Sequence, residues 1–148
     1  MITIIQRVSA AKVTAGNQEI GAIGRGIMAL VAVEKDDTAR AADRLLERIL
    51  NYRIFPDEDG RMNKSLREIN GGLLLVPQFT LAADTSTGNR PSFTGSATPE
   101  KGREWFAYLQ TAADKAYPGT QYGQFGADMQ VTLTNDGPAT FILRVPAA

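Results

Sequence analysis

Apolar residues alternate with polar ones, or follow one another directly, along most of the first 34 positions of the chain. A period of two residues, broken by Ser, Gly and Asn, predicts short strands over residues 2–8, 11–15, 18–23 and 26–34. The last of them, from Gly26 to Val33, contains no polar side chain, which is typical of a strand buried on both faces.

Two later segments have the spacing of amphipathic helices. The first covers residues 38–51, and Asp36 or Asp37 is expected to cap it. The second begins at Thr98-Pro99-Glu100, because proline suits the first helical turn and an acid suits the positive end of a helix. Its predicted buried stripe is Trp105, Leu109, Ala112 and Ala116.

The remaining pattern adds short elements and sets the fold class. Strands are predicted over residues 54–55, 72–76, 129–134 and 141–145, and a short helix over residues 65–69. Strands outnumber helices, and the two long helices do not alternate regularly with them. The sequence therefore predicts an α/β fold with a mixed, partly closed, barrel-like β-sheet and two main helices packed on it. At 148 residues the chain is expected to form one domain, residues 1–148.

The hexapeptide Asn135-Asp136-Gly137-Pro138-Ala139-Thr140 separates the last two predicted strands. Asp-Gly alone predicts an ordinary hairpin turn. Pro138 adds no donor to a strand ladder and gives the Gly137-Pro138 bond access to the cis form. Cis is the minority form of such bonds in folded proteins, so the pattern alone favours trans.

A second motif lies where the apolar run Leu73-Leu74-Leu75-Val76 meets Pro77. The proline is expected to interrupt or edge the strand ladder. Gln78 and Thr80 then fall at the end of a buried strand, which is a usual place for functional groups. The alternative is structural: Thr80 starts a turn and Gln78 caps loose backbone.

Composition excludes several kinds of site. The chain has no histidine and no cysteine, which removes Ser-His-Asp and Cys-His nucleophiles, thiolate zinc sites and disulfides. The acids of residues 56–60 lack EF-hand spacing and are interpreted as a solvated turn, so no metal or cofactor is expected. Sixteen basic and 16 acidic residues give zero net charge, which disfavours a surface for duplex DNA but permits a small patch for a tRNA end. With no membrane-length apolar run and no secretory signal, a cytoplasmic protein is expected.

Seven segments form an ordered set along the chain. They are Gln6-Arg7-Val8, Val33-Glu34-Lys35-Asp36-Asp37, Tyr52-Arg53-Ile54-Phe55, Gln78-Phe79-Thr80-Leu81-Ala82-Ala83-Asp84, Arg90-Pro91-Ser92-Phe93, Ala127-Asp128-Met129-Gln130-Val131 and Asn135-Asp136-Gly137-Pro138. Together they resemble the D-aminoacyl-tRNA deacylase family, also called the D-tyrosyl-tRNA deacylases, nearly from end to end. One departure is visible. The family more often carries serine where this chain has Pro77, which removes a hydroxyl and a backbone donor beside the implied site.

The resemblance implies a hydrolase whose substrate is a D-amino acid esterified to the 3′ end of a tRNA, with mischarged glycyl-tRNA as a further substrate. The ester is already activated and a ribose hydroxyl can assist, so the absence of histidine is compatible with this reaction. Gln78, Phe79 and Thr80 are the implied catalytic residues. We expect the backbone N–H groups of Phe79 and Thr80 to stabilise the oxyanion. The rival is Thr80 Oγ1 as nucleophile, for which no base is obvious nearby in the sequence.

The resemblance also implies a homodimer in which a cis Gly137-Pro138 enters the active site of the partner subunit. There it would reject L-aminoacyl groups by steric exclusion. Arg7 resembles the family residue that hydrogen-bonds this motif, and the alternative is an exposed arginine at a strand edge. Met129 is a candidate for the pocket wall, and the alternative is an ordinary core methionine.

Two functions of other classes stay open on the sequence. The chain could be a non-catalytic domain of the translation apparatus that binds the tRNA end. It could also be an obligate-dimer structural protein in which the tip around residues 137–138 only docks.

Overall fold

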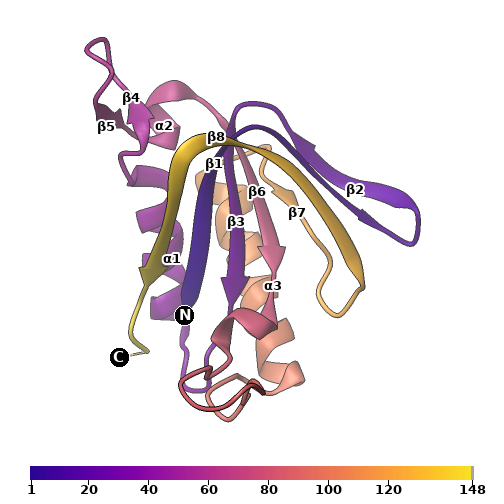
Figure 1. Ribbon diagram of the computed structural model, residues 1–148. Coiled ribbons are helices and arrows are strands. Elements are labelled where there is room, and N and C mark those ends of the chain that lie inside the picture. The colour runs from indigo at the N-terminus through magenta and orange to yellow at the C-terminus, as the bar shows by residue number, and fades with distance from the viewer. Residues whose placement is uncertain (148) are drawn as a thin grey trace.

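The computed structural model describes residues 1–147, and its centre is a six-stranded sheet with helices against one face (Figure 1). The strands are β1 (Ile2–Ala15), β2 (Gln18–Ile23), β3 (Gly26–Ala32), β6 (Gly72–Pro77), β7 (Gln121–Tyr122) and β8 (Met129–Arg144). Hydrogen bonds arrange them in the order β2-β1-β3-β6-β7, and β8 pairs with β1 along nearly its whole length. The β3–β6 and β6–β7 pairs are parallel and the others antiparallel, so the sheet is mixed. The last residue of the predicted domain, 148, lies outside the described residues.

The sheet curls until β2 approaches β7. Gly21 on β2 lies so close to β7 that a Cβ atom there would be 3.0 Å from Tyr122 O, although the two strands share no ladder. Register shifts in β1 near Val8 and Val13 mark bulges, which bend strands and increase their twist. This architecture confirms the predicted fold class: a mixed, partly closed sheet with two main helices.

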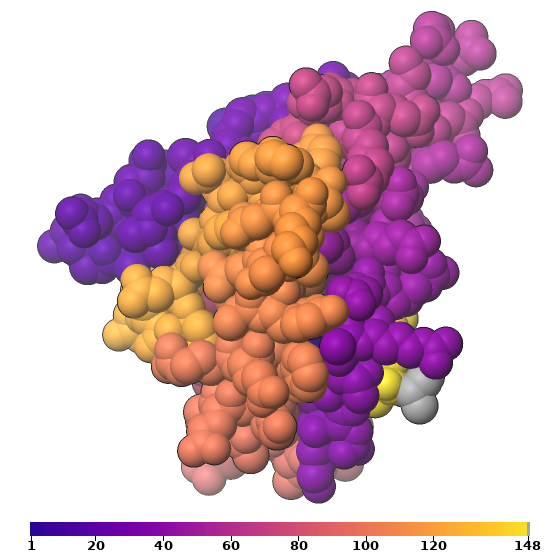
Figure 2. Space-filling view, turned by 180° about the vertical axis from the view of Figure 1, so that it is seen from behind, coloured from indigo at the N-terminus to yellow at the C-terminus, as the bar shows by residue number. Residues whose placement is uncertain are grey.

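The two main helices are α1 (Ala39–Asn51) and α3 (Pro99–Ala116). Smaller elements are the helix α2 (Leu66–Ile69), the 3-10 turn η1 (Phe79–Ala82) and the hairpin of β4 (Phe55–Pro56) and β5 (Met62–Lys64). Seen from behind, the β1–β2 hairpin and the β4–β5 hairpin project from the body on different sides (Figure 2). Within residues 1–147, none of the helices has the length and apolar composition needed to cross a membrane.

Two details of the helices differ from the prediction. Thr38 caps α1, accepting a hydrogen bond from Ala41 N–H at 3.3 Å, whereas Asp36 or Asp37 was expected. Asp37 is instead buried, because its carboxylate binds the amino group of Met1 at 2.7 Å and the N–H of Glu34 at 2.6 Å. The buried stripe of α3 is also rotated from the predicted one and consists of Gly102, Phe106, Leu109 and Ala113.

Two apolar cores lie on the two faces of the sheet. One fills the space between the sheet and the helices and includes Ile27 and Leu73, while the other fills the inside of the curl and includes Met28 and Leu74. Strands β3 and β6 are therefore covered on both faces, which confirms the prediction from their unbroken apolar runs.

Candidate active site

The first predicted site segment follows the last residue of β6. Pro77 pairs with Val31, and Gln78 N–H still donates to Val31 O at 2.8 Å before the chain turns into η1. The first backbone donor inside this turn is Leu81 N–H, which bonds to Gln78 O. Within residues 1–147 the N–H groups of Phe79 and Thr80 thus have no acceptor, as expected of the first donors of a helical turn. Two neighbouring backbone donors at an exposed position are what an oxyanion site requires.

The Thr80 hydroxyl does not have the surroundings of a nucleophile. Its Oγ1 accepts a hydrogen bond from Gln78 Nε2 at 2.7 Å. An amide N–H is a donor and cannot take a proton from the hydroxyl. Among the described residues no carboxylate or amine bonds to Thr80 Oγ1, so the geometry favours the backbone donors over the hydroxyl.

The loop beyond η1 folds back towards the same place. Asp84 and Ser92 exchange backbone hydrogen bonds of 2.7 and 3.0 Å, which closes the loop. The closure places the exposed Phe93 ring against the exposed Phe79 ring, with centroids 5.5 Å apart. Hydrogen bonds from the Ser86 side chain and N–H hold the pKa of the Asp84 carboxyl below its ordinary value.

The second segment, residues 135–140, is a bulge and not a turn. Strand β8 runs without a break from Met129 to Arg144 and pairs with β1 on both sides of this segment. Gln6 pairs with Thr140 and Val8 with Asn135, so the intervening residues of β8 bulge out opposite Arg7. The hairpin turn that Asp-Gly alone predicts does not form, because the strands predicted on either side of it pair with one long strand, β1. The Gly137-Pro138 bond is cis, so the trans preference drawn from the pattern is wrong as well.

Arg7 lies under this bulge. Its Nε donates to Asp136 O at 2.8 Å and lies 3.3 Å from Asp136 Oδ2, while its Nη1 donates to Ile54 O at 2.7 Å. The side chain is only 11% exposed. The alternative of an exposed arginine at a strand edge is therefore wrong.

Met129 lies near the first segment and not near the bulge. It is half-buried at the start of β8 and packs against the core inside the curl. A Cβ atom on Gly123 would lie 3.0 Å from Met129 Sδ and 3.1 Å from Pro77 Cδ, so this glycine is enclosed between the two side chains. Met129 thus stands beside the strand end that leads into Gln78.

The two segments do not meet within one chain. Arg7, under the bulge, pairs with Ile27, which pairs with Leu73, whereas Pro77 pairs with Val31. Leu73 and Pro77 are separated by about 13 Å along β6. The bulge also lies on the side of β1 that faces away from β3 and β6. The structure therefore places Met129 near Pro77, which precedes residues 78–80, and Arg7 beside residues 136–138, but leaves these two groups apart.

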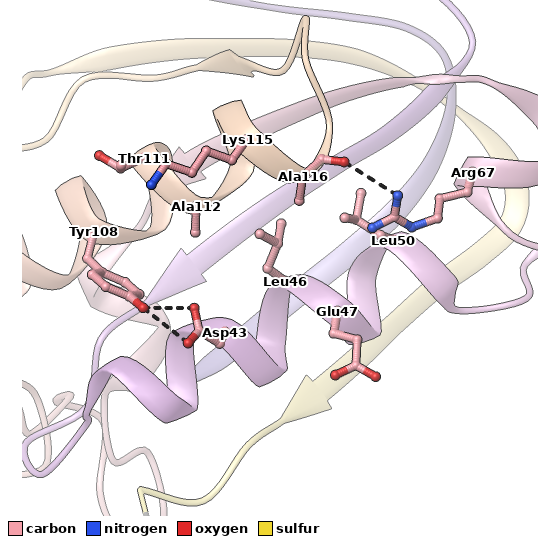
Figure 3. Close-up of a pocket in the computed structure, with 10 residues that line it drawn as sticks. All are labelled: Asp43, Leu46, Glu47, Leu50, Arg67, Tyr108, Thr111, Ala112, Lys115 and Ala116. Carbon is pink, nitrogen blue, oxygen red and sulfur yellow. Dashed lines mark hydrogen bonds between the residues drawn. The ribbon is translucent and has the colours of Figure 1, made fainter.

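A groove of about 470 Å³ lies elsewhere, between α1 and α3 (Figure 3). Tyr108 OH donates to the Asp43 carboxylate at 3.0 Å, and this bond raises the pKa of the tyrosine. Arg67 Nη1 reaches Ala116 O at the other end of the groove. None of the predicted site residues lines this groove.

The family model described as D-Tyr-tRNA(Tyr) deacylase matches residues 4–144. The chain belongs to this family. The match confirms the prediction of a hydrolase of the D-aminoacyl-tRNA deacylase kind. Family membership assigns no residue, so the roles of Gln78, Phe79, Thr80, Gly137, Pro138, Arg7 and Met129 stay predictions.

Relatives of this deacylase match along its whole length. The chain is 56% identical to the D-aminoacyl-tRNA deacylase of Pseudomonas entomophila, over 96% of this chain and 98% of that protein. It is also 56% identical to the D-aminoacyl-tRNA deacylase of Methylococcus capsulatus, over 99% of this chain and 95% of that protein.

Two solved structures share its fold. The c-Myc DNA Unwinding Element Binding Protein superposes with a TM-score of 0.92 at 37% identity, covering 99% of this chain and all of the other. A probable eukaryotic D-amino acid tRNA deacylase gives 0.78 at 18% identity, covering 96% of this chain and 97% of that chain, which shows the fold alone.

Two residues that hold the bulge and Arg7 in place, Ile54 and Asn135, were not predicted. Ile54 O accepts from Arg7, and Asn135 Nδ2 donates to Arg7 O at 2.9 Å and to Ala139 O at 3.2 Å. Asparagine often bonds to nearby backbone in turns, so its presence in the motif was a usable signal. The Ile54 contact uses a backbone carbonyl, so no residue type in the sequence could have indicated it.

Proposed function

We propose that this deacylase hydrolyses the ester bond of D-aminoacyl-tRNA and of mischarged glycyl-tRNA, and that it rejects L-aminoacyl-tRNA. The family match over residues 4–144 supports the reaction class. One structural observation carries the rest of the proposal: residues 78–80 and 137–138 are both on the surface, yet lie apart in a single chain.

The reaction needs placement more than acid–base groups. Water adds its oxygen to the ester carbonyl carbon, the carbonyl oxygen becomes an oxyanion, and the ribose oxygen leaves with a proton. The N–H groups of Phe79 and Thr80 are the proposed donors to the oxyanion. The neighbouring ribose hydroxyl of the tRNA assists the reaction. Gln78 orients the Thr80 side chain by donating a hydrogen bond to its hydroxyl.

A second copy of the chain would complete the site. In the proposed homodimer, residues 137–138 of one copy face residues 78–80 of the other. An apolar row also crosses the sheet face that the helices leave open: Leu30, Ile4 and Ile142 are paired neighbours on β3, β1 and β8, and Ile142 is 66% exposed. A contiguous apolar surface of this kind supports an interface between copies.

Selectivity follows from where main-chain atoms lie. A Gly-Pro backbone pressed against the α-carbon of the substrate leaves room for the hydrogen of a D-residue but not for an L side chain. A glycyl group has no side chain, so it fits against the same backbone. This is discrimination by exclusion, which requires an unfavourable contact with the wrong substrate.

The direct test compares three substrates on the wild-type protein. We expect release of the amino acid from D-tyrosyl-tRNA and glycyl-tRNA, and none from L-tyrosyl-tRNA, measured as loss of acid-precipitable amino acid. Binding of tRNA with no release from any of the three would show a non-catalytic binding domain. A dimer that neither binds tRNA nor releases an amino acid would show a structural protein.

A further inference from the structure

The side chain of Asn135 bonds to both sides of the bulge that it begins. Its Nδ2 donates to Arg7 O on β1 at 2.9 Å and to Ala139 O beyond Pro138 at 3.2 Å. A side-chain amide nitrogen carries two protons, so both are used. One amide group therefore joins the start of the bulge, its end and the neighbouring strand.

Arg7 and the bulge are bonded in both directions. Arg7 O accepts from Asn135, and Arg7 Nε donates to Asp136 O at 2.8 Å. Arg7 is itself held by Ile54 O. The upstream flank of Gly137-Pro138 is thus bonded to β1 directly, and Ala139 on the downstream flank is held through Asn135. Gly137 and Pro138 themselves are exposed.

Asn135 also crowds position 137. A Cβ atom on Gly137 would lie 2.6 Å from Asn135 Oδ1 and 3.4 Å from its Cγ, which are its nearest contacts apart from the two adjacent residues. The oxygen cannot exchange places with Nδ2, because it would then face the carbonyl oxygens of Arg7 and Ala139. A side chain at position 137 would have to displace the Asn135 amide even before a substrate is considered.

We propose that Asn135 is a positioning residue for the discrimination between D- and L-aminoacyl groups. By tying the bulge to β1 it fixes the orientation in which Gly137-Pro138 faces the substrate. The inference rests on the proposed function, since it requires that residues 137–138 meet an aminoacyl group.

Asn135→Ala removes both bonds and leaves the backbone intact. We expect the ratio of kcat/KM for D-tyrosyl-tRNA to that for L-tyrosyl-tRNA to fall about 30-fold, the factor for two neutral hydrogen bonds. Most of the change should come from faster release of L-tyrosine. Thr132→Ala, at an exposed position of the same strand, should keep the wild-type ratio.

A purely structural role for Asn135 gives a different result. Both substrates would then be hydrolysed more slowly by the same factor, and the unchanged ratio would overturn the proposal. Asn135→Asp keeps the shape of the side chain but sets a carboxylate oxygen against two carbonyls, so it should lower the ratio as well. If both Asn135 variants discriminate like the wild type, the positioning role fails while the proposed function stands. If the wild type releases nothing from D-tyrosyl-tRNA, the proposed function itself fails.

A double-mutant cycle tests the link to Gly137. Gly137→Ala should lower the D-over-L ratio when Asn135 is present, because the new methyl group displaces its side chain. In the Asn135→Ala background the same change should have little further effect on the ratio. An equal effect in both backgrounds would show that Gly137 is required by the substrate alone and would contradict the link.

Discussion

Replacing Thr80 with proline is expected to lower kcat/KM for D-tyrosyl-tRNA by a factor of about 10²–10³, the usual effect of losing one oxyanion donor. Proline has no N–H, so the change deletes the proposed donor at this position. Thr80 N–H bonds to nothing within residues 1–147, and proline is accepted in the first turn of a helix. The fold should therefore survive, which circular dichroism and the thermal midpoint can check.

Thr80→Ala is the matched control. It removes the hydroxyl and keeps the N–H, so we expect kcat/KM to stay within a few-fold of the wild type. Complete loss of activity in Thr80→Ala would restore the hydroxyl as nucleophile. Full activity in Thr80→Pro would exclude its N–H from the oxyanion site.

Gly26→Ala is expected to lower the free energy of unfolding by about 3 kcal/mol, the upper end of the cost of overpacking. Gly26 on β3 and Gly72 on β6 are paired neighbours. A Cβ atom on Gly26 would lie 1.9 Å from Gly72 O and 2.6 Å from Gly72 N. These are backbone atoms of a central strand, so the first residues of β3 and β6 must move apart to admit a methyl group.

Urea unfolding at one fixed protein concentration measures this effect, since the stability of the proposed dimer would depend on concentration. Gly24→Ala is the control, because a Cβ atom there meets nothing within 4 Å. It should unfold at the wild-type urea concentration or slightly above. A Gly26→Ala protein as stable as the Gly24→Ala protein would show that β3 and β6 are not packed as described.

The sequence predicted the parts of the fold that depend on local pattern. Unbroken apolar runs identified β3 and β6 as doubly buried strands, and Thr98-Pro99 marked the start of α3. The local pattern gave wrong predictions where a residue or strand far away in the sequence determines the structure. Strand β8 continues through its Asp-Gly-Pro segment because β1 pairs with both halves, and β7 is too short to carry a periodic signal. Thr38 caps α1 in place of Asp37, because the Asp37 carboxylate accepts a hydrogen bond from the amino group of Met1.

The site could be predicted only in part for the same reason. Composition excluded histidine and cysteine chemistry, and strand ends drew attention to Gln78 and Thr80. The Arg7 guanidinium is buried because it bonds to the backbone carbonyls of Asp136 and Ile54. Every residue has a backbone carbonyl, so the sequence does not reveal which ones Arg7 binds. That residues 78–80 and residues 137–138 lie apart in one chain could only come from the register of the sheet.

A hybrid dimer of two defective subunits tests the central claim, that each site combines residues 78–80 of one copy with residues 137–138 of the other. One subunit carries Thr80→Pro and the other Gly137→Phe, and two different tags allow the hybrid to be purified. Each homodimer should have little activity. In the hybrid, one of the two sites would contain only wild-type segments, so about half of the wild-type kcat should return on D-tyrosyl-tRNA. A hybrid as inactive as both homodimers would show that each site is built within a single chain and would contradict the account.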